Sequence, residues 1–233
     1  MRDRLSPPAT RPITRRVALS VDVVLLTPHG RQLTLLLVRS LDSRAKERWE
    51  TPWDTVRAGE TLEDAAQRIA RAALGAAPAM VEQVGAFGGK RHPGDADVSV
   101  AFLALAPAGS PAPMGGDNGW FPVDDLPAVP PRHRAVIDST LQALRGRVDQ
   151  SPIAFRLLPA TFTLSQLQEV YEMLLGRRLH KASFRRALHA AWLVEPTDEW
   201  RTEGRGRPAQ LFRYAPRRRR GTRRGVRFEA MGG

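Results

Sequence analysis

The sequence predicts an α+β fold, in which a mixed sheet packed between helices is followed by a smaller domain of two helices and a β-hairpin. Apolar β-rich runs alternate with helical patterns over the first two thirds of the chain. Two more helical patterns and two short strand patterns follow a polar segment at 146–152. The charge divides at the same place, because residues 1–150 carry a net +2 and residues 151–233 a net +10. A chain of 233 residues has room for two such domains.

The first domain is predicted from hydrophobic periodicity and turn residues. Two β-rich runs flank a Pro28–Gly30 turn and indicate a hairpin. An alanine-rich helix should turn one apolar face inward, made of Leu62, Ala65, Ala66, Ile69 and Ala73. The predicted elements are a flexible arm at 1–14, strands at 17–26 and 32–40, the helix at 60–74, strands at 81–89 and 98–106, a loop at 107–119 and a helix at about 133–144.

The second domain has the element order of a winged helix. Thr163 and Gln166 have capping-box spacing, and an apolar helical pattern follows them until Gly176. A second helix is expected at about 180–192, with strands at 193–196 and 209–214 joined by a Gly-rich basic loop. This helix should bury Phe184, Leu188, Ala191 and Trp192 and expose Lys181, Arg185, Arg186 and His189. We therefore divide the chain into an arm at 1–14, domains at 15–147 and 152–216, and a basic tail at 217–233.

The charge of the second domain and the tail predicts a double-stranded DNA partner. Cations and a small hydroxyl on an exposed helix face suit major-groove recognition. The tail contains RRRRGTRR and should add salt-sensitive, non-specific affinity. A solvated basic face and a protein-binding winged helix are the alternatives. The predicted DNA contacts are Ser183, Arg185 and Arg186 to bases or nearby phosphates, Lys181 to phosphate, and Arg205 and Arg207 from the wing.

The segment from Trp49 to Gly75 resembles the signature of the Nudix hydrolases. Its residues Gly59, Glu60, Arg68 and Gly75 fall in register with that signature, whereas Trp53 and Asp54 replace a glycine pair. By this resemblance, the metal-binding glutamates would stand where Ile69, Ala72 and Ala73 stand here. Mg²⁺ requires carboxylate oxygens, so the resemblance implies a Nudix fold over about 15–147 without catalytic residues or bound metal. Glu60, Glu63 and Asp64 remain, but a helix start also favours acids.

The second domain resembles the C-terminal module of the Nudix-related transcriptional regulators of NAD metabolism, the NrtR-like proteins. The phrases that carry the resemblance are FRLLP, FTLSQLQEVYE, SFRR and GRPAQLFRY. The resemblance implies a homodimeric repressor that binds a palindromic operator and responds to ADP-ribose or a related nucleotide. The chain departs from the family pattern at Trp53-Asp54, where a bulky indole should reshape the floor of the effector pocket. It also departs at His180, Ala182 and Ser183 of the recognition helix, which bears on the operator sequence. We expect Arg39, Trp53, Arg57 and Phe87 to line a nucleotide pocket, with core packing as the alternative for the two aromatic residues.

Three functions remain open on the sequence. The chain is a regulator whose Nudix domain binds a nucleotide without cleaving it, a diphosphate hydrolase that uses Glu60, Glu63 and displaced acids, or a DNA-binding protein with a ligand-free Nudix scaffold. The chain has no cysteine, its five histidines show no metal-ligand spacing, and the glycines of 85–89 lack P-loop spacing. No cofactor and no metal are therefore expected. The apolar run at 17–26 is too short to span a bilayer, which predicts a cytoplasmic protein without a membrane partner.

Overall fold

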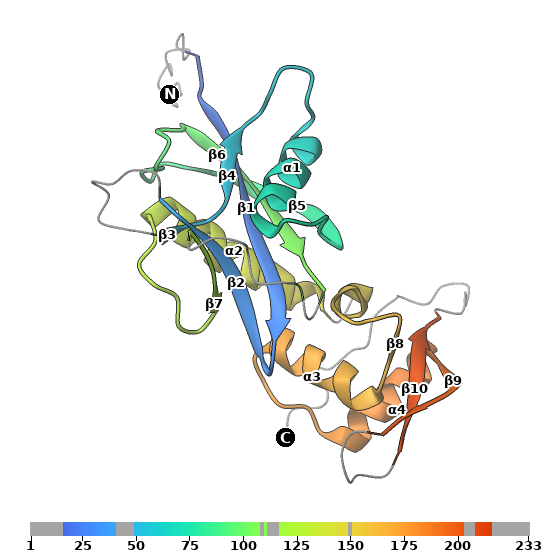
Figure 1. The fold of residues 1–233 in the computed structure, drawn as a ribbon. Helices are drawn as coiled ribbons and strands as arrows, with labels where there is room; N and C mark the ends of the chain where they lie inside the picture. Colours follow the sequence, from blue (N-terminus) through green and yellow to red (C-terminus); the bar gives the residue numbers. More distant parts are fainter. Residues whose placement is uncertain are drawn as a thin grey trace, which may run out of the picture.

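The computed structural model describes residues 16–40, 49–107, 110, 117–148, 151–202 and 208–215. These residues form two lobes, a sheet with a helix on each face and a smaller winged helix beside one end of the sheet (Figure 1). The predicted arm at 1–14 and the basic tail at 217–233 lie outside the described residues. The predicted fold class, a mixed-sheet α/β/α sandwich followed by a winged helix, is confirmed.

Seven strands of the described chain form one mixed sheet. Its main path runs β3-β2-β1-β6-β5, while β4 pairs with β1 and β7 with β2. The β1–β6 pair is parallel and the other pairs are antiparallel. Gly30 makes the turn between β1 and β2 with a φ of 58°, a conformation that favours glycine. The strands are β1 (Leu19–His29), β2 (Gln32–Arg39), β3 (Trp49–Glu50), β4 (Trp53–Thr55), β5 (Met80–Gly88), β6 (Val98–Leu105) and β7 (Asn118–Pro122).

Two helices cover the two faces of the sheet. Helix α1 (Leu62–Leu74) packs its alanine-rich face against β1 and β6. Thr61 and Asp64 close a capping box at its start, and Gly75 ends it in the left-handed conformation. The helix thus begins two residues after Glu60, which stands in the preceding turn rather than in the helix we predicted. Helix α2 (Pro131–Arg147) covers the opposite face and is longer at both ends than its sequence pattern indicated.

The second lobe is a winged helix whose first helix begins with the predicted capping box. The side chain of Thr163 accepts from the backbone of Gln166, and the Gln166 side chain accepts from the backbone of Thr163. Phe184 and Leu188 of the second helix are fully buried. The elements are a 3₁₀ helix η1 (Pro152–Leu157), β8 (Thr161–Phe162), α3 (Leu164–Leu175), α4 (Lys181–Ala191), β9 (Val194–Arg201) and β10 (Ala209–Tyr214), with β10 between β8 and β9.

Two predictions for this lobe were wrong. Trp192 is 49% exposed instead of buried, because it ends α4 in the left-handed conformation (φ 51°) and its side chain leaves the helical face. Strand β9 continues through Arg201, so TDEW belongs to the hairpin strand and not to its loop. Pairing of β9 with β10 satisfies backbone groups that a loop would leave to water.

The two lobes share one apolar core. Buried residues of β1, β2, β6 and α2 form a continuous cluster with those of η1, α3 and α4. The tip of the β1–β2 hairpin reaches the side of α3 (Figure 1). The predicted linker is short, because α2 ends at Arg147 and η1 begins at Pro152, with the Ser151 amide donating to the Arg147 carbonyl. Such packing resists free rotation of one lobe on the other.

Candidate ligand pocket and nucleic-acid interface

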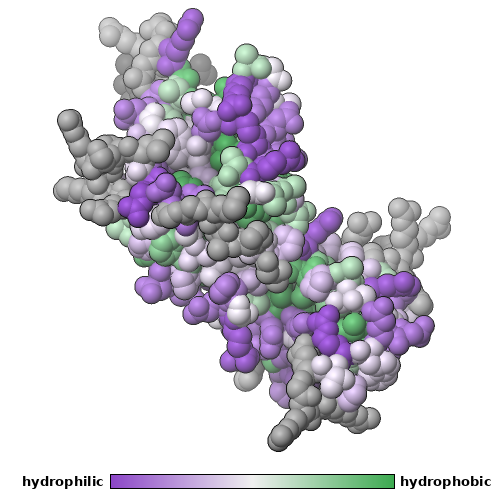
Figure 2. Space-filling model, in the orientation of Figure 1, coloured by the Kyte–Doolittle hydropathy of each residue, from purple (hydrophilic) through white to green (hydrophobic). Residues whose placement is uncertain are grey.

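A cavity with a volume of about 780 Å³ lies beside α1 at the edge of the sheet. That volume falls within the range of small-molecule sites. Figure 2 shows hydrophilic residues gathered over α1, beside paler and apolar surface. The pocket-lining residues are Val38, Arg39, Ser40, Glu50, Pro52, Trp53, Asp54, Arg57, Arg68, Ile69, Ala72, Ala73, Pro93, Gly94 and Asn118.

Arg68 is the central fixed charge of this pocket. Its Nε and Nη2 donate to the two oxygens of Glu60 at 2.7 and 2.9 Å, and its Nη1 donates to Asp54 at 2.6 Å. The Arg68 guanidinium holds the pKa of Glu60 down to about 2, with help from the Arg57 amide. The hydrogen bonds from Arg68 to Glu60 and Asp54 in turn raise the pKa of Arg68. Glu60 is therefore an ionised anchor for Arg68 at neutral pH.

The three positions assigned by resemblance to metal-binding glutamates all lie at this pocket. Ile69, Ala72 and Ala73 contribute to its wall from the side of α1. These three residues share one face of α1 because residues three and four apart in a helix lie on the same side. The wall that a Nudix hydrolase would use for metal is apolar here.

Three of the four residues predicted to bind a nucleotide come together in this pocket. Arg39 and Arg57 line it with exposed side chains, and Trp53 forms part of its wall. The Trp53 indole donates to Glu50 at 2.7 Å, and its ring stands nearly perpendicular to that of His92 with the two ring centroids 4.6 Å apart. The structure does not bring Phe87 to the pocket, since Phe87 packs against the core shared with α2 and the winged helix. The contacts with Glu50 and His92 thus hold the Trp53 ring in place at the wall of the pocket.

A buried polar cluster lies next to Trp53 and was not predicted. Asp22 of β1, His92 from the β5–β6 connection and His133 of α2 are almost inaccessible to solvent, and their ligand-type atoms all lie within 4.8 Å of one another. Nε2 of His92 lies 3.2 Å from Oδ1 of Asp22, and Nε2 of His133 lies 3.8 Å from Oδ2. These residues are far apart in the sequence, so no local spacing could have indicated their convergence.

The hydrogen bonds of this cluster favour a carboxylate–imidazole network over a metal site. Backbone amides of Gly94 and Thr51 donate to Nδ1 of His92 and His133, at 3.0 and 3.3 Å. A neutral ring that accepts at Nδ1 carries its proton on Nε2, the atom that a metal would need. Both Nε2–H groups therefore face Asp22, that of His92 at hydrogen-bond distance and that of His133 beyond it. Burial lowers the pKa of His133 to about 4, whereas interactions with His92 and His133 outweigh the burial of Asp22 and lower its pKa.

Helix α4 presents the predicted basic face. Lys181, Arg185 and Arg186 are exposed, while Phe184 and Leu188 anchor the opposite side. Ser183 is half-buried, and its hydroxyl lies 3.3 Å from Nδ1 of His180 and 3.4 Å from Nη2 of Arg186. The wing residues Arg205 and Arg207 lie outside the described residues. The described part of the predicted DNA interface is therefore the face of α4 on which Lys181, Arg185 and Arg186 are exposed to solvent.

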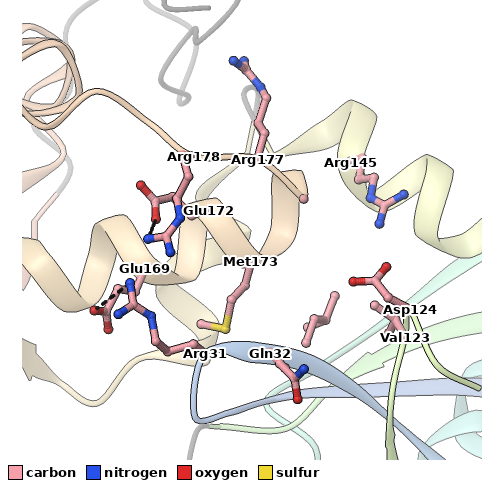
Figure 3. A pocket seen from close by; sticks show the side chains of 12 residues that line it. Arg31, Gln32, Val123, Asp124, Arg145, Glu169, Glu172, Met173, Arg177 and Arg178 are labelled. Atoms are coloured by element: carbon pink, nitrogen blue, oxygen red, sulfur yellow. Dashed lines mark hydrogen bonds and ion pairs between the residues drawn. The ribbon is translucent and has the colours of Figure 1, made fainter.

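A second cavity of about 290 Å³ lies at the joint between the lobes (Figure 3). Glu169 of α3 is 4.0 Å from Arg31 at the tip of the β1–β2 hairpin. Glu169 stands in the middle of α3, whereas at the carboxyl end of the helix Nη2 of Arg145 would lie 3.6 Å from a Cβ placed on Gly176. A guanidinium at the carboxyl end of a helix interacts favourably with its dipole. Two arginines of the sheet domain therefore flank the helix that precedes α4, which the sequence did not indicate.

The comparisons with known families divide the chain as the fold does. Residues 16–144 match the NUDIX domain, and residues 154–214 match the NrtR DNA-binding winged helix domain. NrtR of Shewanella oneidensis, solved both alone and complexed with a 27mer DNA, is 30% identical. Its TM-scores are 0.74 alone and 0.72 with DNA, over 85% of this chain and 94% of that one. The chain belongs to the NrtR family.

Two other relatives extend this result. The ADPR responsive transcriptional repressor NtrR of Acinetobacter baylyi is 27% identical over 205 residues, which cover 84% of this chain and 82% of the relative. A MutT/nudix family protein from Enterococcus faecalis shares the fold at 19% identity, with a TM-score of 0.71 over 87% of this chain and 89% of that one. Within the described ranges, no helix is long and apolar enough to cross a membrane.

Proposed function

We propose that this chain is a transcriptional repressor that binds double-stranded DNA through α4 and responds to a nucleotide bound beside α1. The observation that carries the proposal is the union, in one chain, of an exposed basic recognition helix and a Nudix pocket without metal-binding glutamates. The relative in Acinetobacter baylyi, described as ADPR-responsive, makes ADP-ribose the effector to test first. Such a protein would work in the cytoplasm.

The DNA contacts follow from the exposed side chains of α4. Arg185 and Arg186 point from the helix into solvent and can reach bases or phosphates, while Lys181 at its start reaches phosphate. Ser183 joins them only if DNA replaces its contacts with His180 and Arg186. We also assign Arg205 and Arg207 of the wing to phosphates or the minor groove. The protein would bind a palindromic operator as a homodimer.

The catalytic alternative is a diphosphate hydrolase that uses Glu60 and Glu63. Glu60 is held by Arg68 and the Arg57 amide, and Glu63 stands exposed in the first turn of α1, away from the pocket lining. We therefore infer that the chain is not an enzyme. A Mg²⁺-dependent turnover of ADP-ribose that disappears in Glu60→Gln and Glu63→Gln would establish the hydrolase instead.

The first experiment is selection of genomic DNA fragments by the purified protein near physiological salt, followed by sequencing. A palindromic motif should emerge, and Arg185→Gln should abolish its enrichment while Arg134→Gln on α2 should not. Uniform recovery of all fragments would contradict a sequence-specific regulator. Calorimetry with ADP-ribose then distinguishes a Nudix domain that senses a nucleotide from one that serves only as a scaffold. A protein with a scaffold domain would bind the operator but would bind no nucleotide.

A further inference from the structure

The pocket beside α1 has the wrong charge for a divalent cation. Among its described lining residues, Arg39, Arg57 and Arg68 are cationic, and Glu50 and Asp54 are the carboxylates. The three wall positions that would supply free carboxylates are Ile69, Ala72 and Ala73. Mg²⁺ needs oxygen ligands, ideally ionised carboxylates, and is repelled by guanidinium groups. The residues present therefore do not fit the metal that the Nudix fold implies.

The carboxylates that remain are already engaged. Oε2 of Glu50 accepts from the Trp53 indole at 2.7 Å, and Oδ2 of Asp54 accepts from Arg68 at 2.6 Å. Glu60, next to the pocket, accepts two hydrogen bonds from the same Arg68. A metal would have to displace Arg68 from both of its partners. Charge-assisted hydrogen bonds of this length are among the stronger contacts in proteins, which makes that exchange unfavourable.

Two other arginines are held loosely enough to bind a ligand. Arg57 is 3.9 Å from Asp54 with its side chain 67% exposed, and Arg39 is 3.6 Å from Asp117 with its side chain 47% exposed. Exposed ion pairs at these distances contribute little free energy. A phosphate group carries the same negative charge as the carboxylate it would replace, and it can accept two hydrogen bonds from one guanidinium. The Arg39 guanidinium also lies 5.5 Å from the Trp49 ring centroid, which restricts its position beside the pocket.

We propose that this pocket binds the diphosphate of its nucleotide without a divalent cation, with Arg39 and Arg57 in the place of the metal. The inference rests on the proposed sensor function and specifies its ligand chemically. A diphosphate esterified at both ends carries one negative charge on each phosphate, so two guanidinium groups neutralise it. Nucleotides of this class would bind in their metal-free form, and the protein would respond to the free nucleotide rather than to its magnesium complex.

Isothermal titration calorimetry of the full chain with ADP-ribose, in millimolar Mg²⁺ and separately in EDTA, tests the proposal. The dissociation constants should agree within about twofold, whereas loss of one bidentate contact in Arg57→Gln or Arg39→Gln should weaken binding about tenfold or more in both buffers. Arg71→Gln, an exposed arginine of α1 outside the pocket lining, is the matched control and should bind as the parent does. Affinity at least tenfold weaker in EDTA would overturn metal-free binding and leave the sensor function intact. No binding in either buffer would refute the sensor function itself.

A variant that returns acids to the wall provides a second, independent measurement. Ala72 is exposed and Ala73 is buried, and both line the pocket, so the double substitution Ala72→Glu/Ala73→Glu places two carboxylates there. Its ADP-ribose affinity should become dependent on Mg²⁺, falling about tenfold in EDTA because the added charges repel phosphate. Thermal unfolding identifies any loss of fold. A folded double variant that binds equally in both buffers would contradict the role assigned to these wall positions.

Discussion

Acidification should destabilise this protein through one buried imidazole, His133. Burial lowers its pKa to about 4 from the ordinary 6.5, so the ring is neutral in the folded chain over most of that interval. The unfolded chain takes up a proton as the pH falls below 6.5, and the folded chain does so only near pH 4. The stability that neutral His133 confers is therefore present above pH 6.5 and lost progressively between 6.5 and 4.

The two pKa values fix the size of the effect. Between pH 7 and pH 4.5 they correspond to a loss of about 2 kcal/mol in the free energy of unfolding. Asp22 does not contribute in this window, because its folded pKa is lowered from 3.8 and its protonation falls at a lower pH. Glu60, whose pKa falls from the ordinary 4.5 to about 2 on folding, begins to lose its contribution only at the lower end of this window, and it does so equally in the parent and in a His133 variant.

Urea unfolding at pH 7 and pH 4.5, followed by tryptophan fluorescence, measures this loss. The matched variant is His133→Asn, whose side-chain oxygen can still accept from the Thr51 amide and does not titrate. The variant starts less stable, since it leaves a cavity, but its loss between the two pH values should be about 2 kcal/mol smaller than that of the parent. Equal pH-dependent losses in the two proteins would refute a buried neutral His133.

Three further predictions concern the winged helix. Phe184→Ala removes a fully buried ring and should lower the free energy of unfolding in urea by about 3–5 kcal/mol. The variant should also lose operator affinity. An unchanged urea midpoint of unfolding would contradict the place of Phe184 in the core. Lys181→Gln should reduce the slope of log K against log salt by about 1 in anisotropy titrations, and an unchanged slope would remove Lys181 from the phosphate contacts. Arg145→Gln should lessen the ADP-ribose-induced drop in DNA affinity about threefold while stability changes by less than about 1 kcal/mol, because the Arg145 guanidinium of α2 lies beside Gly176 at the end of α3. An intact drop would exclude Arg145 from the coupling.

Local patterns predicted much of the fold because their causes are local. The Thr163–Gln166 capping box and the apolar spacing of α3 depend on residues within one or two turns, and both are confirmed. The positions of Ile69, Ala72 and Ala73 on one wall follow from helical spacing alone. Strands β3, β4 and β7 were not predicted, because short half-buried strands take their hydrogen bonds from distant neighbours rather than from their own pattern.

The sequence by itself determined the two-domain organisation, the basic face of α4 and the apolar residues at positions 69, 72 and 73 of α1, since each depends on composition or on spacing within one element. Tertiary structure decided which distant residues meet. It packed Phe87 against the core instead of the pocket, and it brought Asp22, His92 and His133 together from β1, a connection and α2. It also paired Arg68 with both Asp54 and Glu60. These contacts depend on the register of strands and the packing of helices, which no single segment of the sequence encodes.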